Sequence, residues 1–171
     1  MRWSKLKQRF EDGFADSAKG RVEVWCTRYR RAHDEEGEGW ITVDKQRVHS
    51  MGTLTYMIES FERANQIRQE NDCVEYRDPD NILGYCAVHE TVKAQLIDEG
   101  KISFYAFNSA LFDYLNTPFE EIQSSEQTVI RALSMFDKRL GKRRLKTMDV
   151  SEENELVQKF YQLRCVFEGI Q

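Results

Sequence analysis

The hydrophobic pattern of this chain changes its period once, near residue 53, and no other feature constrains the fold as much. Before that point, the stretch "RVEVWCTRYR" at 21–30 alternates between two sets of side chains, as a half-buried β-strand does. After it, apolar residues recur at helical spacing, first at Leu54, Met57, Ile58, Phe61, Ala64 and Ile67. The chain therefore combines a small N-terminal sheet with a larger set of helices.

The N-terminal part is predicted to form one helix followed by antiparallel strands. Leu6 and Phe10 share a face of a short helix at 4–12. The polar turn "HDEEGEG" separates the first strand from "WITVD" at 40–44, and a third strand is expected within 46–51. We predict a β-hairpin or a three-stranded meander over 21–51. A sheet of two or three strands is not stable with its apolar face exposed, so we expect the helices to cover that face.

About five or six helices are predicted beyond residue 52, packed together as a bundle. Their ends are marked by "DPDN" at 78–81, by Gly100 after a helix that ends near residue 98, by Ser103, by a capping box that starts at Ser124, and by Ser151. The predicted fold class is α+β. Residues 1–171 form a single domain, with a helix and antiparallel strands over 1–51 and a helical part over 52–171.

The charge balance argues against a general nucleic-acid binder. Residues 1–85 carry 14 Lys/Arg and 16 Asp/Glu, and residues 86–171 carry 11 and 13, so each half contributes −2 to the net charge of −4. The four cysteines form no C-x-x-C pair, and the N-terminus lacks the apolar core of a signal peptide. No apolar run is long enough to span a bilayer. We therefore expect a cytoplasmic protein with reduced thiols and no membrane partner.

No catalytic constellation is apparent. His33, His49 and His89 are far apart in the sequence, and none has a second histidine at metal-ligand spacing. Phosphate loops and nucleophile-elbow patterns are absent from the sequence. Arg28 and His33 have the spacing of a helical ribonuclease pair, but the alternation before Arg28 predicts a strand. The sequence predicts no enzyme activity, no metal site and no cofactor.

The stretch "DKRLGKRRLK" at 137–146 places six cations in ten positions. We favour a structural corner: the preceding helix runs to Leu140, Gly141 ends it in the left-handed conformation, and Asp137 accepts a bond from a following arginine. The alternative is a site for phosphate or nucleic acid built from the cations of 138–146. Both interpretations use the same residues, namely Asp137, Arg139, Gly141, Lys142, Arg143 and Arg144.

Several segments together resemble a family of small uncharacterised bacterial cytoplasmic proteins. They are "WSKLK" at 3–7, "RYR" with "GWIT" in the strand region, "IRALSMFDKRLGKRRL" at 130–145 and "FYQLRC" at 160–165. The D-x-R-x-G-K-R pattern that starts at Asp137 is the most specific of them. The resemblance implies a bacterial, soluble, single-domain protein and brings with it no activity, cofactor or catalytic residue.

We expect a non-enzymatic module that binds another protein. Trp25, Tyr29 and Trp40 are the predicted partner-binding residues, because aromatic side chains dominate interface energetics. The alternative for the two tryptophans is a place in the core beneath the helices. By analogy, small acidic bacterial proteins of this kind include immunity proteins and antitoxins. The alternative function is a nucleic-acid or phospholigand binder that uses the basic corner 138–146.

Overall fold

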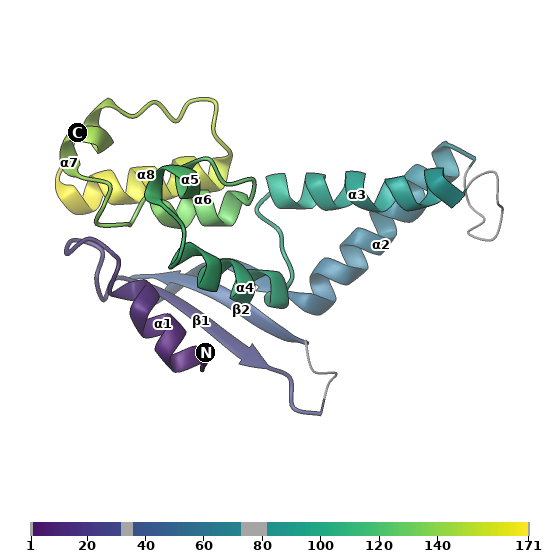
Figure 1. Ribbon diagram of the computed structural model, residues 1–171, viewed down its shortest axis with the longest axis horizontal. Helices are drawn as coiled ribbons and strands as arrows, with labels where there is room; N and C mark the ends of the chain where they lie inside the picture. Colours follow the sequence, from purple (N-terminus) through teal and green to yellow (C-terminus); the bar gives the residue numbers. More distant parts are fainter. Residues whose placement is uncertain (1, 32–35, 73–81, 171) are drawn as a thin grey trace.

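The structure, a computed structural model, describes residues 2–31, 36–72 and 82–170. It contains three strands and, in these residues, eight helices (Figure 1). In chain order they are α1 (Trp3–Glu11), β1 (Val22–Arg28), β2 (Gly37–Val43), β3 (Gln46–Gly52), α2 (Thr53–Glu70), α3 (Ile82–Asp98), α4 (Phe104–Tyr114), α5 (Phe119–Gln123), α6 (Thr128–Ser134), α7 (Lys142–Thr147) and α8 (Glu155–Glu168). The predicted α+β class is confirmed.

The strands form an antiparallel meander in the order β1-β2-β3. Val24 lies opposite Ile41 in the register of the first pair. The tight turn between β2 and β3 places Asp44 and Lys45 at φ 48° and 68°, the backbone that a two-residue hairpin turn requires. The three-stranded alternative is therefore the one that forms.

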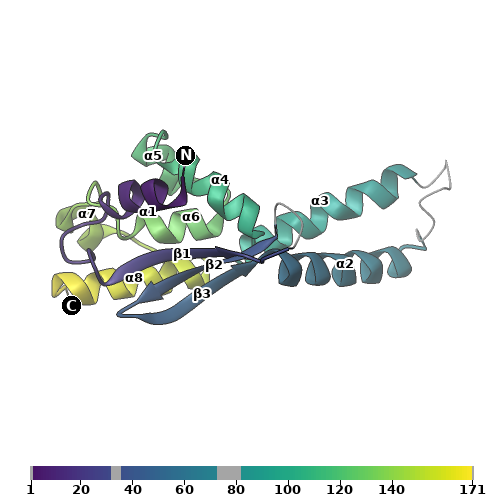
Figure 2. The same cartoon turned by 90° about the horizontal axis from the view of Figure 1, so that it is seen from below.

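One face of the sheet is covered by helices, and Figure 2 shows α1, α4 and α6 on the same side of it. Val22, Val24 and Ile41 are buried on this inner face. Helix α4 approaches β2 so closely that a Cβ at Gly39 would lie 2.7 Å from the Phe107 ring. Only glycine leaves room for that approach, so Gly39 allows the aromatic core of α4 to rest directly on the sheet.

The main core lies between the sheet and the C-terminal helices. Val129, Ala132 and Leu133 of α6 are fully buried at its centre. The Phe136 ring packs against the rings of Phe14 and Phe160, at centroid distances of 6.2 and 5.2 Å. This aromatic cluster joins segments from both ends of the chain.

Two predicted helix boundaries are wrong. The helix that was expected to run to Leu140 ends at Ser134, because the backbone of Phe136 and Lys138 bonds instead to Ala15 and Gly13. The last helix is capped by Asn154, whose Oδ1 accepts from the Leu156 N–H at 2.8 Å, and Ser151 lies outside it. At the first boundary a contact from elsewhere in the chain replaces the local helix signal, and at the second a cap three residues further on replaces Ser151.

The expected capping box also differs from the structure, whereas two other predicted helix ends are correct. Helix α6 begins at Thr128 after Gln127, without the side-chain cap that was expected from Ser124. Ser103 accepts from the Ala106 N–H at 3.1 Å and caps α4. Gly100 has a φ of 75° and follows the end of α3, as predicted.

Helices α2 and α3 form an antiparallel hairpin that projects from the rest of the molecule (Figures 1 and 2). It has a small core of its own, made of Ala64, Val88, Val92 and Leu96. We call α2 and α3 the hairpin, and the sheet with the other helices the body. None of the described helices is both long enough and apolar enough to cross a membrane.

Candidate functional site

The predicted partner-binding tryptophans lie together on the outer face of the sheet. Trp25 and Trp40 are cross-strand neighbours, and their rings stack with centroids 6.5 Å apart and planes at 13°. Both are half-buried, and the Trp25 Nε1–H donates to Thr42 Oγ1 at 3.2 Å. They therefore lie on the face opposite the helix-covered core, and part of each ring reaches solvent.

The two rings are flanked by cations of the protein itself. Lys7 Nζ lies 4.0 Å from the centre of the Trp25 ring, and the Arg47 guanidinium lies 4.4 Å from that of Trp40. Tyr29, the third predicted residue, follows the end of β1 and is exposed. It has the same strand parity as Trp25 but lies four residues along, about 13 Å away. The structure thus brings the two tryptophans together without Tyr29.

The basic corner is organised around a buried carboxylate. Asp137 is 2% exposed and accepts a bond from the Tyr114 hydroxyl at 2.7 Å. Its two oxygens also accept from the Arg139 backbone N–H at 2.7 Å and from the Arg139 guanidinium at 2.8 Å. The expected bond from a following arginine is therefore formed. Burial, followed by the Asp137 charge, raises the pKa of Tyr114, and the bond to Asp137 raises the pKa of Arg139.

Helix α8 closes the other side of this corner. The buried Arg164 donates to the Phe136 carbonyl at 3.2 Å and pairs with Glu168 at 2.9 Å. Lys142 Nζ pairs with the same Glu168 at 2.8 Å, and Ser17 donates to it. Burial lowers the pKa of Arg164. Burial raises the pKa of the Glu168 carboxyl, but the hydrogen bonds from Lys142 and Ser17 lower it by more, so the pKa lies below its usual value.

Gly141 does not have the predicted role. Its φ is −72° and ψ is 157°, so it is extended rather than left-handed, and it precedes α7 instead of ending a helix. A Cβ at this position would meet no atom within 4 Å. The expectation was wrong because the chain has already left the helix at Ser134 and needs no left-handed residue to turn at 141.

The Arg139 and Arg144 guanidinium groups both lie over the Phe119 ring, at 5.1 and 5.6 Å, but the polar contacts of the cations in 138–146 are separate. Lys138 donates to the Asp12 carbonyl, Lys142 pairs with Glu168, and Arg144 donates to Gln123 at 2.9 Å. Arg143 is exposed. A phosphate site needs several cations that converge on one ligand, and this arrangement divides them.

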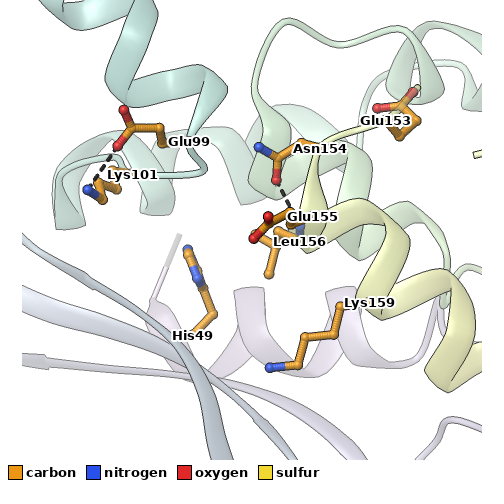
Figure 3. Close-up of a pocket in the computed structure, with 8 residues that line it drawn as sticks. All are labelled: His49, Glu99, Lys101, Glu153, Asn154, Glu155, Leu156 and Lys159. Carbon is orange, nitrogen blue, oxygen red and sulfur yellow. Dashed lines mark hydrogen bonds and ion pairs between the residues drawn. The ribbon is translucent and has the colours of Figure 1, made fainter. Parts of the chain in front are cut away.

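A polar pocket of about 620 Å³ opens where β3, the end of α3 and the start of α8 meet (Figure 3). Figure 3 shows His49 and Lys159 on its lower side, with Glu155 above them. His49 Nε2 lies 2.8 Å from the Gly100 carbonyl, so this nitrogen carries the proton and donates. Burial lowers the pKa of His49, which favours the neutral ring.

Most residues of this pocket have structural tasks. Asn154 caps α8 and donates to the Asp98 carbonyl at 2.7 Å. Lys101 pairs with Glu99 at 2.9 Å and with Glu59 at 2.6 Å, which ties the base of α3 to α2. The lining has no cysteine or serine that could act as a nucleophile. Within 2–31, 36–72 and 82–170, no three His, Cys, Asp or Glu side chains gather as a metal ion would require.

The proposed ribonuclease pair does not occur in the required form. Arg28 is the last residue of β1, so it does not project from a helix. His33 lies outside the described residues. Because that hypothesis needs both side chains on one helix, the strand at Arg28 rules it out.

Four exposed large apolar residues lie on one face of α2, where the sequence indicated a buried face. Leu54, Met57, Ile58 and Phe61 are 45, 56, 59 and 62% exposed. We call these four residues the apolar stripe. Together with His89 of α3 they line a groove of about 520 Å³ on the hairpin. Isolated exposed apolar residues are ordinary, but a contiguous row of them on one helix is less common.

The helix face that contains these residues was predicted correctly, but its burial was not. All six apolar positions from Leu54 to Ile67 fit one broad helix face, yet only Ala64 and Ile67 pack against α3. The other four are exposed because the hairpin leaves the body and nothing in the described chain covers that side of α2. The sequence contains a clue to this. A helix that packs on one side can bury only one stripe of side chains, and α2 has more large apolar residues than such a stripe holds.

Comparison with known proteins identifies a family. Searches of curated proteins and of solved structures return no match. The model of the SF0329 protein family matches residues 2–165, which is nearly the whole chain and includes the body, the hairpin and the basic corner. The protein therefore belongs to the SF0329 protein family.

Proposed function

We propose that this protein is a non-enzymatic protein-binding module and that the apolar stripe of α2 is its main contact surface. The observation that carries the proposal is the exposure of four large apolar side chains in one row on a projecting hairpin. Exposing such side chains to water is unfavourable by roughly 25 cal/mol per Å². A partner that covers them recovers that free energy, so the stripe is best explained as a binding surface.

The chemistry of the groove defines the kind of partner. The stripe residues lie at positions i, i+3, i+4 and i+7 of α2, and His89 of α3 lies across the groove. Such a groove accommodates an amphipathic helix with apolar residues at the same spacing. The partner is therefore a protein that presents an apolar helix face, and Trp25 with Trp40 forms a second candidate anchor on the sheet.

Two finer parts of the proposal rest on analogy and composition. Small acidic binding modules include immunity proteins and antitoxins, and we propose that class for this chain, whose net charge is −4. A cytoplasmic location is supported by Cys26, Cys86 and Cys165, which are free thiols. The alternative, a nucleic-acid or phospholigand binder, has less support because the cations of the basic corner are directed to separate contacts.

The test compares capture by three forms of the immobilised protein. The wild type, Phe61→Glu and Val166→Glu are incubated with lysate of the native host, and each captured protein is then purified and its Kd measured. Val166 is 70% exposed on α8, so Val166→Glu is a matched control for a charge at an exposed apolar position. We expect Phe61→Glu to weaken binding at least 100-fold and Val166→Glu to bind like the wild type.

Two results would overturn the proposal. One is that no protein, this chain included, binds in a way that depends on Phe61. The other is salt-sensitive binding to mixed DNA, RNA or nucleotides that is lost in a Lys142→Ala, Arg143→Ala, Arg144→Ala triple variant, since each phosphate contact adds about 0.9 to the log–log salt slope on duplex DNA.

A further inference from the structure

Strand β1 forms one edge of the sheet, and its backbone groups alternate between bonding to β2 and pointing away from it. Beyond the end of the strand, the Tyr29 N–H still donates to the Glu36 carbonyl at 3.2 Å and continues the ladder to β2 by one residue. The odd-numbered residues of β1 therefore bond to β2. The N–H and C=O groups of the even-numbered residues, from Val22 to Arg28, point outwards along the edge.

The first half of this edge is closed by other parts of the chain. The Val22 N–H donates to the Ala18 carbonyl at 3.0 Å. The Val24 N–H donates to Glu11 Oε1 at 2.8 Å, and the Val24 carbonyl accepts from Lys7 Nζ at 3.0 Å. Cover of this kind keeps an edge strand from pairing with another chain.

The second half of the edge is open. No described residue bonds to the outward N–H and C=O groups of Cys26 and Arg28. Figures 1 and 2 show that β1 extends past the start of α1. Its register with β2 is regular up to Arg28, whereas the opposite edge strand β3 contains an irregularity next to Ile41 and Thr42. The ligand that matches such a row of donors and acceptors is an extended polypeptide.

A cluster of positive charge follows directly on the open edge. Arg28, Tyr29, Arg30 and Arg31 are all exposed, and we call these four residues the arginine tip. None of its arginines forms an ion pair with a described residue, and Glu36 bonds to the tip only through its backbone carbonyl. Six other arginines of the body do pair with carboxylates, namely Arg21, Arg47, Arg131, Arg139, Arg144 and Arg164.

These two features together define the chemistry of the ligand. Guanidinium groups bind carboxylates through paired hydrogen bonds, so the tip favours an acidic segment. A strand added beside Cys26 and Arg28 directs its side chains alternately to the two faces of the sheet. Side chains on the Arg28 face are then acidic. Those on the other face lie beside Trp25 and Tyr29, so apolar residues suit these positions.

We infer that the open half of the β1 edge and the arginine tip bind an extended acidic segment of another protein. The segment adds a strand to the sheet beside Cys26 and Arg28, and its carboxylates pair with the tip. A nucleic acid fits less well, because its backbone has no N–H donors for the outward carbonyl groups and the chain carries a net charge of −4. This surface goes beyond the proposed function, since it is separate from the apolar stripe.

The first test measures the affinity for a labelled acidic peptide, acetyl-DVEVDE-amide, by fluorescence anisotropy at low salt. We expect the wild type to bind it and to leave the basic peptide acetyl-KVKVKK-amide unbound. The double variant Arg30→Glu, Arg31→Glu should weaken binding by about 10-fold or more. The double variant Arg9→Glu, Arg143→Glu changes the net charge equally at two exposed arginines outside the tip, and it should bind like the wild type.

The second test separates strand addition from simple charge attraction. Two versions of the acidic peptide carry N-methyl groups on alternate residues, one on the odd and one on the even positions. An added strand directs the N–H groups of only one set towards β1. We therefore expect one N-methylated peptide to bind nearly as well as the parent and the other to bind about 10-fold or more weaker.

Several outcomes would overturn the inference. They are a wild type that fails to bind the acidic peptide at about 1 mM, unchanged binding by the tip variant, and equal binding of the two N-methylated peptides. Tighter binding to single-stranded DNA than to the peptide, lost in the tip variant, would overturn the choice of partner. Phe61→Glu should bind the peptide like the wild type. Loss of the peptide in Phe61→Glu would place it on the apolar stripe, which contradicts this inference and leaves the proposed function standing.

Discussion

The body and the hairpin are both built from amphipathic helices, yet they use apolar residues in different ways. In α6 of the body six of seven residues are buried, because the helices α8, α5, α4 and α3 all pack against it. In α2 of the hairpin only Thr53, Ala64 and Arg68 of 18 residues are buried. The apolar content of a helix therefore does not determine its burial, which depends on how many other elements pack against it.

Polar contacts differ between the two regions as well. In the body the buried Asp137 and Arg164 bond to backbone and hydroxyl groups and also pair with Arg139 and Glu168, next to a large apolar core. In the hairpin the buried Arg68 lies 3.6 Å over the Tyr85 ring, and its guanidinium donates to the Tyr85 carbonyl at 3.2 Å. Because the apolar core of the hairpin is much smaller than that of the body, we expect the hairpin to open more readily.

The strongest test of this difference removes the same side chain from each core. Leu133 in the body and Leu96 in the hairpin are both fully buried. We expect Leu133→Ala to lower the free energy of unfolding by about 3–5 kcal/mol, as in a core that cannot collapse around the cavity. Leu96→Ala should lower it less and should accelerate amide exchange in α2 and α3 alone. Urea unfolding with hydrogen-exchange mass spectrometry measures both, and equal global losses would contradict the comparison.

A second test removes the buried carboxylate of the body. Asp137→Ala leaves the Tyr114 hydroxyl and the Arg139 N–H without their acceptor, and we expect a loss of about 1–3 kcal/mol in the free energy of unfolding. Arg143→Ala, at an exposed residue of the same corner, is the control and should change stability by about 0.5 kcal/mol or less. If Asp137→Ala unfolds like the wild type but loses a ligand, the corner is a binding site.

A third test uses pH against the charged network of the hairpin. Bonds from Arg63 and then Lys101 lower the pKa of Glu99 from 4.5 to about 2, and Lys101 likewise lowers the pKa of Glu59. A carboxyl with a lowered folded pKa stabilises the fold fully above pH 4.5, and this contribution is lost as the pH falls towards 2. For such exposed groups we expect less than about 1 kcal/mol.

The measurement is thermal unfolding of the wild type and Glu99→Gln between pH 6 and pH 2.5. The difference in Tm should be largest at pH 6 and should shrink below pH 4.5. Glu62→Gln serves as the control on the same hairpin and should show little difference from the wild type at any pH. A difference between wild type and Glu99→Gln that stays constant with pH would show that the network does not tie α2 to α3.

The smallest expected effect is at Gly141. The residue is extended, and a Cβ there meets no neighbouring atom, so a β-branched side chain is accommodated without strain. We expect Gly141→Val to change the free energy of unfolding by about 0.5 kcal/mol or less. Gly39→Val is the opposite case, because its Cβ would meet the Phe107 ring, and it should be strongly destabilising. A large loss at Gly141 would restore the left-handed interpretation.

Much of the fold was predictable because its signals are local. The period change near residue 53 coincides with the end of β3 at Gly52 and the start of α2 at Thr53. The left-handed Gly100 after α3 and the Ser103 cap were also predicted. Each of these features depends on backbone preferences or hydrogen bonds within a few residues.

The corner at 135–141 was harder to predict because its cause is remote in sequence. Phe136 and Leu140 are buried and continue the spacing of α6, so the pattern alone extends the helix. The backbone there pairs with residues 13–15, more than 120 positions away, and that pairing ends the helix early. No local pattern records such a contact.

By itself, the sequence determined which residues share a helix face, where the sheet gives way to helices, and that Asp137 is followed by an arginine that can bond to it. Only the tertiary structure decided that Leu54, Met57, Ile58 and Phe61 face solvent while Ala64 and Ile67 on the same helix pack against α3. The physical reason is that periodicity depends on the backbone of one helix, whereas burial depends on which other elements fold against it.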